Sequence, residues 1–560
     1  MKTSSHISTE HLLYGAAVAL AFGVRLWHLG QAPLSEEEAQ LALQALDVAA
    51  RHPTTLGSAP LLTALTGLAF FLLGSTDAIA RLVPALLGGL LPLLAWPLRP
   101  YLGRRGALIL AFALALDPGL VALSRVANSP IPAALALTAA VLAAAHNRWR
   151  WALPLAAAGM LLGPTFWLGL LSLGLGLALY RVAGHEIRIP FSAAEARQGA
   201  GLALSVLVFG GSLAFWAPEG FGAVFNSLLA FGRGLLALQA APLALLGLAL
   251  VAYAPLAVGA GLIGAALAGH RRAAFPALLG WLALSAALLI MFYPGRSPQD
   301  LVWVLIPLWG VAAWALAQLP TSHPKDLGWQ TAVALAILSF AWFNFLAWGN
   351  AAPNIPTARL NLILGLVSLG LLVVVSGLMA ISWRDVGRSW REAWGGLTWG
   401  LTLAGVALLW AATMRVVNGP REAELWYPHA TTAQMRLLQQ TVGDLGLWHH
   451  GRRDALQLVD LTGSKATAWA FHNLSNARQA LALLPDEHPE AILTPEGFTP
   501  SQTETAYYGQ DFTLTAAPLW PLGDARAVMR WLAFRQHPSG GSSVILWARE
   551  DLFPQAQAQP

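Results

Sequence analysis

Apolar runs of membrane-spanning length recur along the first 417 residues. A helix needs about 20 apolar residues to cross the hydrocarbon core of a bilayer. The first run lacks a small-residue cleavage site and is followed by many others, so we interpret it as a retained helix and not as a signal peptide. The region 151–181 is either two short helices or one long one, and the total is about thirteen spans. The runs lie near 11–29, 80–98, 106–123, 130–146, 151–164, 165–181, 199–216, 243–268, 274–292, 301–319, 328–348, 360–382 and 394–415.

Basic residues occupy every second connection between these runs. An excess of Lys and Arg marks cytoplasmic loops, so the alternate loops 30–79, 124–130, 217–242, 293–300 and 349–359 are predicted to face outward. An odd number of spans then places the N-terminus in the cytoplasm and the C-terminus outside the cytoplasmic (plasma) membrane. The basic connections contain Arg99, Arg104, Arg105, Arg148, Arg150, Arg181, Arg197, Arg271, Arg272, Lys325, Arg384, Arg388 and Arg391.

The pattern changes after Met414. Alternating apolar and polar residues at 455–459 and 543–547 predict strands, and 431–445 has helical periodicity. We therefore predict a transmembrane helical domain over 1–417 and a small extracytoplasmic α/β domain over 418–560, a normal domain size.

Composition agrees with a polytopic α-helical membrane protein. Hydrophobic residues make up 56% of the chain and charged residues only 11%, against roughly 25% charged in soluble domains. The absence of cysteine excludes disulfides, thiolate zinc sites and Cys-ligated iron–sulfur clusters. The net charge of +5 lies in short loops beside the apolar runs, which indicates membrane anchoring and no nucleic-acid partner.

Three motifs in the first quarter of the chain occur in a characteristic order. An Arg-Leu-Trp segment ends the first run at 25–27, an acidic triplet at 36–38 is followed by Ala39, and Gly-Ser-x-Asp-Ala-x-Ala-Arg-Leu occupies 74–82. This order resembles the C superfamily of membrane glycosyltransferases (GT-C fold), in its protein O-mannosyltransferase-like group. Within that group it is most similar to the flippase-associated glycosyltransferases of bacteria and archaea. A Trp-x-x-x-Arg-like segment of their outer domain corresponds to 469–473.

The resemblance implies a hexosyltransferase. Such enzymes move a sugar from a polyprenyl-phosphate donor to an acceptor outside the cytoplasm, here with inversion, and an acidic residue of the first outer loop acts as base. Glu37 aligns with the Asp of the family pattern and Glu38 with its Glu. The resemblance gives no acceptor, which could be protein, lipid or glycan.

The residues themselves suit this chemistry. A carboxylate must take the proton of the acceptor hydroxyl, and cations must hold the leaving phosphate. Glu37 and Glu38 are the catalytic candidates. The candidates for binding the lipid phosphate or the sugar are Arg296, Arg125, Asn128 and Arg233.

Structural interpretations of the same residues stay open. Ser35 and Glu38 have the spacing of a capping box, so the triplet can simply begin an interfacial helix. Arg296 can reach ordinary lipid headgroups. Arg81 is predicted to pair with Asp77 four residues earlier. His449 and His450 are adjacent, which predicts side chains that point apart and chelate metal poorly.

Three departures from the family pattern favour a second hypothesis. Glu37, one methylene longer, stands where the family has Asp, and Ser58 stands where the family has His. Asn128 stands where related enzymes have Asp, so a second carboxylate is missing there. The chain could then be a weakened or inactive relative that acts as a membrane scaffold or lipid- and glycan-handling partner. No cofactor and no metal ligand is predicted, although a dependence on divalent metal stays open.

Overall fold

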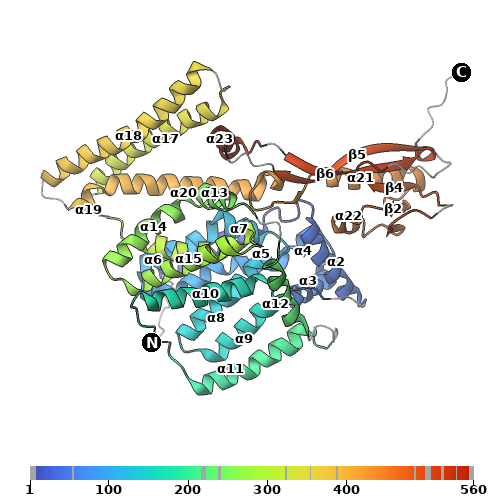
Figure 1. The fold of residues 1–560 in the computed structure, drawn as a ribbon, viewed down its shortest axis with the longest axis horizontal. Helices are drawn as coiled ribbons and strands as arrows, with labels where there is room; N and C mark the ends of the chain where they lie inside the picture. The colour runs from blue at the N-terminus through green and yellow to red at the C-terminus, as the bar shows by residue number, and fades with distance from the viewer. Residues whose placement is uncertain are drawn as a thin grey trace, which may run out of the picture.

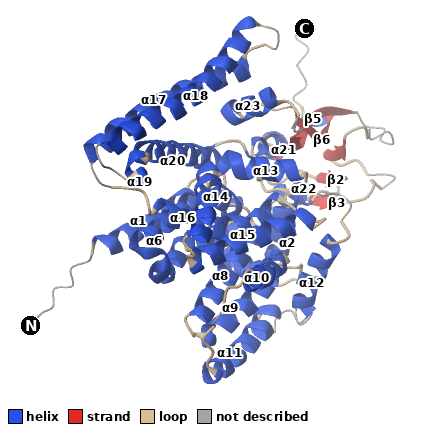
Figure 2. Ribbon diagram, turned by 60° about the vertical axis from the view of Figure 1, so that its left-hand side comes forward, coloured by secondary structure: helices blue, strands red, loops and turns tan. Residues whose placement is uncertain are grey.

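The computed structural model describes residues 8–52, 56–187, 189–215, 222–237, 241–321, 324–352, 355–385, 389–484, 487–498, 506–518, 523–537 and 539–553. Parts of the predicted outer loops 217–242 and 349–359, and Arg388, lie outside these residues. Figure 1 shows a large helical bundle with a sheet domain at one end, and Figure 2 shows that the strands are confined to that domain.

The bundle is a multi-pass membrane domain. Within the described residues, seven helices are long and apolar enough to cross a membrane, or eight if one bent pair counts as a span. Helix α16 is its most enclosed span, with Val302, Leu305 and Trp309 buried. The bundle helices are α1 (Thr9–Leu26), α5 (Leu82–Gly89), α6 (Arg99–Leu116), α7 (Pro118–Ser124), α8 (Pro130–Ala145), α9 (Trp149–Leu161), α10 (Thr165–Val182), α11 (Ala193–Ser205), α12 (Ala223–Gly234), α13 (Leu243–Tyr253), α14 (Pro255–His270), α15 (Ala274–Phe292), α16 (Val302–Leu316), α17 (Pro324–Asn350), α18 (Pro356–Asp385), α19 (Trp390–Ala393) and α20 (Gly395–Asn418).

The predicted count of about thirteen spans is not confirmed, because several apolar runs fold as broken helices. The run at 80–98 divides into α5 and a 3₁₀ segment, Leu91–Leu98, that contains Pro92 and Pro97. The run at 243–268 bends by 94° between α13 and α14, where Pro255 begins the second helix. Proline cannot donate a helical hydrogen bond and disfavours helix at the residue before it. The open question at 151–181 is settled as two helices, which Gly163 (φ +129°) and Pro164 separate.

The C-terminal domain has the predicted α/β character. Its six strands have the order β1-β5-β6-β4-β2-β3, with β2 parallel to β3 and β4 and the other pairs antiparallel. Helix α23 returns from the sheet to α17, where Met529 packs beside Gly349. The elements are η5 (Arg421–Ala423), β1 (Ala430–Thr431), α21 (Gln434–His450), β2 (Leu458–Asp460), α22 (Lys465–Ala470), β3 (Ala477–Gln479), β4 (Ala491–Pro495), β5 (Tyr507–Pro518), α23 (Ala525–Phe534), β6 (Ser539–Arg549) and η6 (Glu550–Leu552).

The loop 30–79, the first one predicted to face outward and called the first outer loop below, packs against this domain. It contains α2 (Glu36–Ala50), α3 (Pro60–Leu73) and α4 (Asp77–Ala80). Ala39, Ala42 and Phe70 from these helices belong to the same hydrophobic cluster as residues of the sheet domain. Phe70 stacks on Trp469, with 5.5 Å between ring centroids. The loop therefore lies between bundle and sheet, and both domains fix its position.

Candidate functional site

The acidic triplet forms the first turn of α2, as the sequence predicts. The Ser35 hydroxyl accepts a hydrogen bond from the Glu38 amide at 3.4 Å, and the Ser35 amide donates to Glu38 Oε2 at 3.0 Å, which completes the capping box. Successive residues of a helix point about 100° apart. The three carboxylates consequently face three different surroundings.

Glu36 binds the sheet domain. Its carboxylate accepts hydrogen bonds from the backbone amides of Lys465 (2.6 Å) and Ala466 (3.0 Å) and from the Ser464 hydroxyl (2.7 Å), at the start of α22. An anionic group at a helix N-terminus satisfies amides that have no partner within the helix. Glu36 therefore docks α22 onto α2.

Glu36→Ala is expected to loosen this contact by about 0.5–2 kcal/mol, the usual loss when a helix-capping side chain is removed. The amides of α22 should exchange with deuterium faster, whereas those of α16 in the bundle should not change. Unchanged protection of α22 would show that the contact contributes nothing.

Glu38 lies at the centre of a buried ion cluster. Arg81 Nε and Nη2 donate to its two oxygens at 2.6 and 2.8 Å, and Arg421 donates from 3.2 Å. The Ala127 amide adds a hydrogen bond at 3.0 Å. Burial alone would raise the pKa of Glu38, but Arg81 and Arg421 hold it well below its ordinary value. The carboxylate is fully occupied and joins α2, the second outer loop and η5.

The predicted ion pair between Arg81 and Asp77 does not form. Arg81 points to Glu38 instead, and Asp77 pairs with Arg436 of α21 and accepts a hydrogen bond from Trp469 Nε1 at 2.6 Å. The i, i+4 spacing fails because α4 ends at Ala80, so the two residues do not share one helix face. The Trp469 segment, which resembles the family's outer-domain motif, thus docks on the first outer loop.

Glu37 is the member of the triplet that lines a polar cavity of about 380 Å³. Its side chain is exposed. Asn128 Nδ2 donates to Glu37 Oε2 at 3.4 Å and to Gln299 Oε1 at 2.8 Å, so one amide connects the first, second and later outer loops. The cavity brings together two residues that the sequence identifies as candidates, Glu37 and Asn128. Its other lining residues include Gln40, Gln44, Ser58, Thr63, Ser129, Thr165, Tyr293, Ser297, Gln299 and Asp300.

Sequence reasoning missed a carboxylate in this cavity. Asp300 is buried, and its Oδ2 accepts hydrogen bonds from the Ser297 amide at 2.8 Å and hydroxyl at 3.2 Å. A carboxylate from another loop thus lines the cavity in which Asn128 stands at the family's Asp position. The spacing of Ser297 and Asp300 could have predicted a capping box from the sequence. No sequence pattern, however, predicts that Asp300 lies in the same cavity as Glu37.

Arg296 and Arg233, two arginines of loops predicted to face outward, do not line the cavity. Arg296 lies between the lining residues Gly295 and Ser297, but its guanidinium donates to the carbonyls of Ala241 (2.8 Å) and Met291 (3.3 Å). Arg233 is exposed in the last turn of α12, whose Ala230 and Phe231 line the cavity. Arg296 holds loops together, whereas Arg233 is exposed on a helix whose preceding residues line the cavity.

Arg125 caps the first helix. It is buried, and its guanidinium donates to the carbonyls of Val24 (3.1 Å), Trp27 (2.6 Å) and His28 (3.3 Å) at the end of α1, and to that of Val417 (3.2 Å). These are the carbonyls that a helix end leaves without partners. Arg125 lines a separate cavity of about 230 Å³ and does not reach Glu37's cavity.

An apolar cavity of about 1240 Å³ adjoins the polar one. Neighbouring residues of three segments line the two cavities: Leu61 and Thr63, Pro132 and Ser129, and Leu162 and Pro164. The far part of the apolar cavity is lined by Arg99, Arg104 and Arg148. A long apolar volume thus connects a basic end with the neighbourhood of Glu37.

No protein-family model matches the sequence, and no curated protein shows significant sequence similarity to it. Solved structures do match the fold. ArnT from Cupriavidus metallidurans bound to undecaprenyl phosphate aligns with a TM-score of 0.55 at 14% identity, over 97% of this chain and 99% of that chain. ArnT from the same organism in the apo state aligns with a TM-score of 0.54 at 14% identity, over 96% and 97%. ArnT is a GT-C glycosyltransferase, so the chain has the GT-C fold. The likeness does not distinguish a subfamily.

Proposed function

We propose that this chain is an inverting glycosyltransferase that takes a sugar from a polyprenyl-phosphate donor at the outer face of the cytoplasmic membrane. The observation that carries the proposal is the position of Glu37, an exposed carboxylate in a polar cavity beside a long apolar one. The fold supports it, because ArnT binds undecaprenyl phosphate. The basic loops support the outward orientation of this site.

The reaction follows from the chemistry of the donor. The acceptor oxygen attacks the anomeric carbon, and the bond from that carbon to the phosphate oxygen breaks. Glu37 takes the acceptor proton, and polyprenyl phosphate leaves with the bonding electron pair. Asn128, which also donates to Gln299, orients the Glu37 carboxylate. We assign Glu38 to structure, because its oxygens are occupied by Arg81 and Arg421.

The leaving phosphate needs a cation. Of the three candidate arginines, Arg233 is exposed on a helix that lines the cavity, whereas Arg296 and Arg125 are engaged with backbone carbonyls. The side chains that line the cavity also include the oxygen donors Glu37, Asp300 and Gln299, a class that hard divalent cations prefer. A metal dependence is therefore worth testing with chelator in the same assay.

The alternative is an inactive relative that retains the fold as a scaffold. Asn128, which stands where the family has Asp, favours this inactive scaffold. The argument against catalysis is weakened by Asp300, because this residue provides a second carboxylate in the same cavity. The enzyme is accordingly the preferred hypothesis.

The assay that tests the function is reconstitution with polyprenyl-phosphate sugars and measurement of released polyprenyl phosphate. Ala139→Trp, in the apolar cavity lined by α8, should reduce release from long-chain donors by about tenfold or more, equivalent to about 1.4 kcal/mol, because the ring occupies the space of the chain. Leu371→Trp, on the exposed face of α18, is the matched control. Release that is absent with every donor, while the lipid still binds, would support the scaffold instead.

A further inference from the structure

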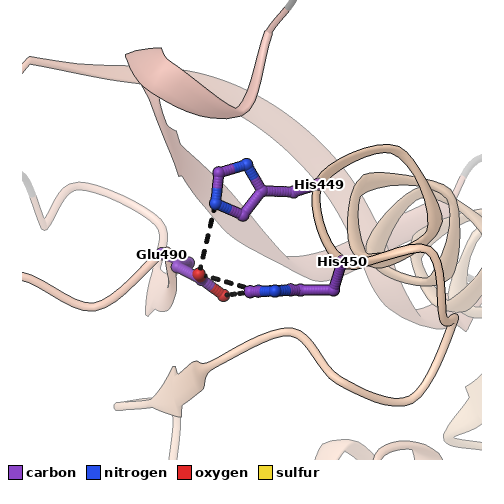
Figure 3. Close-up of side chains that lie close together, drawn as sticks. All are labelled: His449, His450 and Glu490. Carbon is purple, nitrogen blue, oxygen red and sulfur yellow. Dashed lines mark hydrogen bonds and ion pairs between the residues drawn. The ribbon is translucent and has the colours of Figure 1, made fainter.

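Three potential metal ligands converge in the sheet domain, far in sequence from the acidic triplet. His449 and His450 end α21, and Glu490 immediately precedes β4. His450 Nε2 lies 2.8 and 2.9 Å from the two oxygens of Glu490, and His449 Nε2 lies 3.8 Å from Oε1. Figure 3 shows both imidazoles pointing at the same carboxylate. The expectation that adjacent histidines point apart is therefore wrong at this helix end.

The ring orientations of His449 and His450 explain how two adjacent side chains can both face Glu490. The two imidazoles are nearly perpendicular, at 85°, with centroids 4.7 Å apart. Gly451 ends the helix with φ +70°. The histidines consequently approach Glu490 from two sides. All three donor atoms lie within 4.8 Å of one another.

Glu490 is fixed in position before any ligand binds. Only 8% of its surface is exposed, and its Oε2 accepts a hydrogen bond from the Gln457 amide at 2.9 Å. Such outer contacts orient a carboxylate ligand toward a metal. Arg549, a nearby cation, is neutralised by Asp551, with contacts of 2.6 and 2.9 Å.

We propose that His449, His450 and Glu490 bind a divalent transition metal of the zinc class. Two imidazole nitrogens and one carboxylate oxygen are the donors that Zn²⁺ accepts, at about 2.0–2.2 Å. Donors at that distance in a tetrahedral site are roughly 3.3–3.5 Å apart. His449 must rotate slightly inward, and the proton that His450 shares with Glu490 must leave. Water completes the coordination, and the metal joins the end of α21 to the start of β4.

The test uses the full-length protein in detergent, with any polyhistidine tag removed and metal stripped by chelator. Titration with Zn²⁺ should show one saturable site per chain and a rise in melting temperature. His449→Ala should weaken binding by about tenfold or more, because it removes one ligand. This variant is chosen because His449 is exposed and its contact is loose, so folding should not change.

His429→Ala is the matched control. His429 is an exposed histidine that precedes β1, three strands from β4 in the sheet, and Zn²⁺ affinity should be unchanged. Glu490→Gln should also weaken binding and gives a second measurement on another ligand. Zn²⁺ affinity that is equal in wild type and His449→Ala, or the lack of a saturable site, would overturn the proposal.

Discussion

Glu37→Gln is expected to lower sugar transfer by about 10²–10⁴-fold, the usual contribution of a positioned general base. Gln keeps the shape of the side chain and can still accept a hydrogen bond from Asn128, but it cannot take a proton from the acceptor. Because Glu37 is exposed and makes one hydrogen bond, at 3.4 Å, its replacement should leave folding intact. The measurement is the rate of polyprenyl phosphate release in proteoliposomes, alongside the melting temperature.

Asp47→Asn is the matched control for this variant. Asp47 is a partly exposed carboxylate on the same helix but does not line the cavity. Its transfer rate should equal that of wild type. Glu37→Asp should retain part of the activity, since the carboxylate remains but lies one methylene further away. Full activity of Glu37→Gln would remove Glu37 from the mechanism, and equal loss in Asp47→Asn would indicate an indirect effect on α2.

Local patterns predicted the part of the site that lies on one helix. Ser35 and the acidic triplet specify the start of α2. Gln40 and Gln44 follow Glu37 at helical spacings of three and seven residues, so the face toward the cavity could have been predicted as polar. The GT-C fold followed from the motif order in the first quarter of the chain. The subfamily, the acceptor and the sugar have no comparable signal.

The parts of the site that could not be predicted from the sequence depend on contacts between residues far apart in the chain. Arg421 is more than 380 residues from Glu38, and Asp300 reaches the cavity from a loop with no motif that connects it to Glu37. The spacing of Arg81 and Asp77 predicted an ion pair between them, but in the folded chain Arg81 pairs with Glu38. Likewise, the convergence of His449 and His450 depends on where α21 ends and on the strand opposite.

The triplet also has a collective role. Glu36 holds α2 to the sheet domain, and Glu38 holds it to Arg81 between α4 and α5 and to the second outer loop. Two anchored neighbours on adjacent helical positions fix the backbone from which the Glu37 side chain extends. Orientation of a catalytic group is worth several orders of magnitude in rate. In the proposed mechanism, the sheet domain thereby holds the helix that carries the base Glu37.

Glu38→Gln is expected to cost about 3–5 kcal/mol of local stability, because it leaves Arg81 and Arg421 buried without their counter-ion. Hydrogen exchange of amides in α2 and η5 should accelerate accordingly, since exchange reports the free energy of local opening. Asp454→Asn removes an exposed pair with Arg452 and should give no measurable change. Normal protection of α2 in Glu38→Gln would show that the cluster does not hold the loop.

The same cluster gives a pH dependence with a defined sign. Arg81 and Arg421 outweigh the effect of burial and keep the folded-state pKa of Glu38 below its ordinary value of 4.5. An unfolded chain therefore binds this proton more readily than the folded one, and the stabilisation is complete above pH 4.5 and lost as the pH falls further. Protection of α2 in wild type should decrease on acidification below this value, while Glu38→Gln, which has no proton to gain, should lack this component. If the hydrogen-exchange protection of α2 in wild type did not change between pH 7 and about 3, the proposed stabilisation by ionised Glu38 would be contradicted.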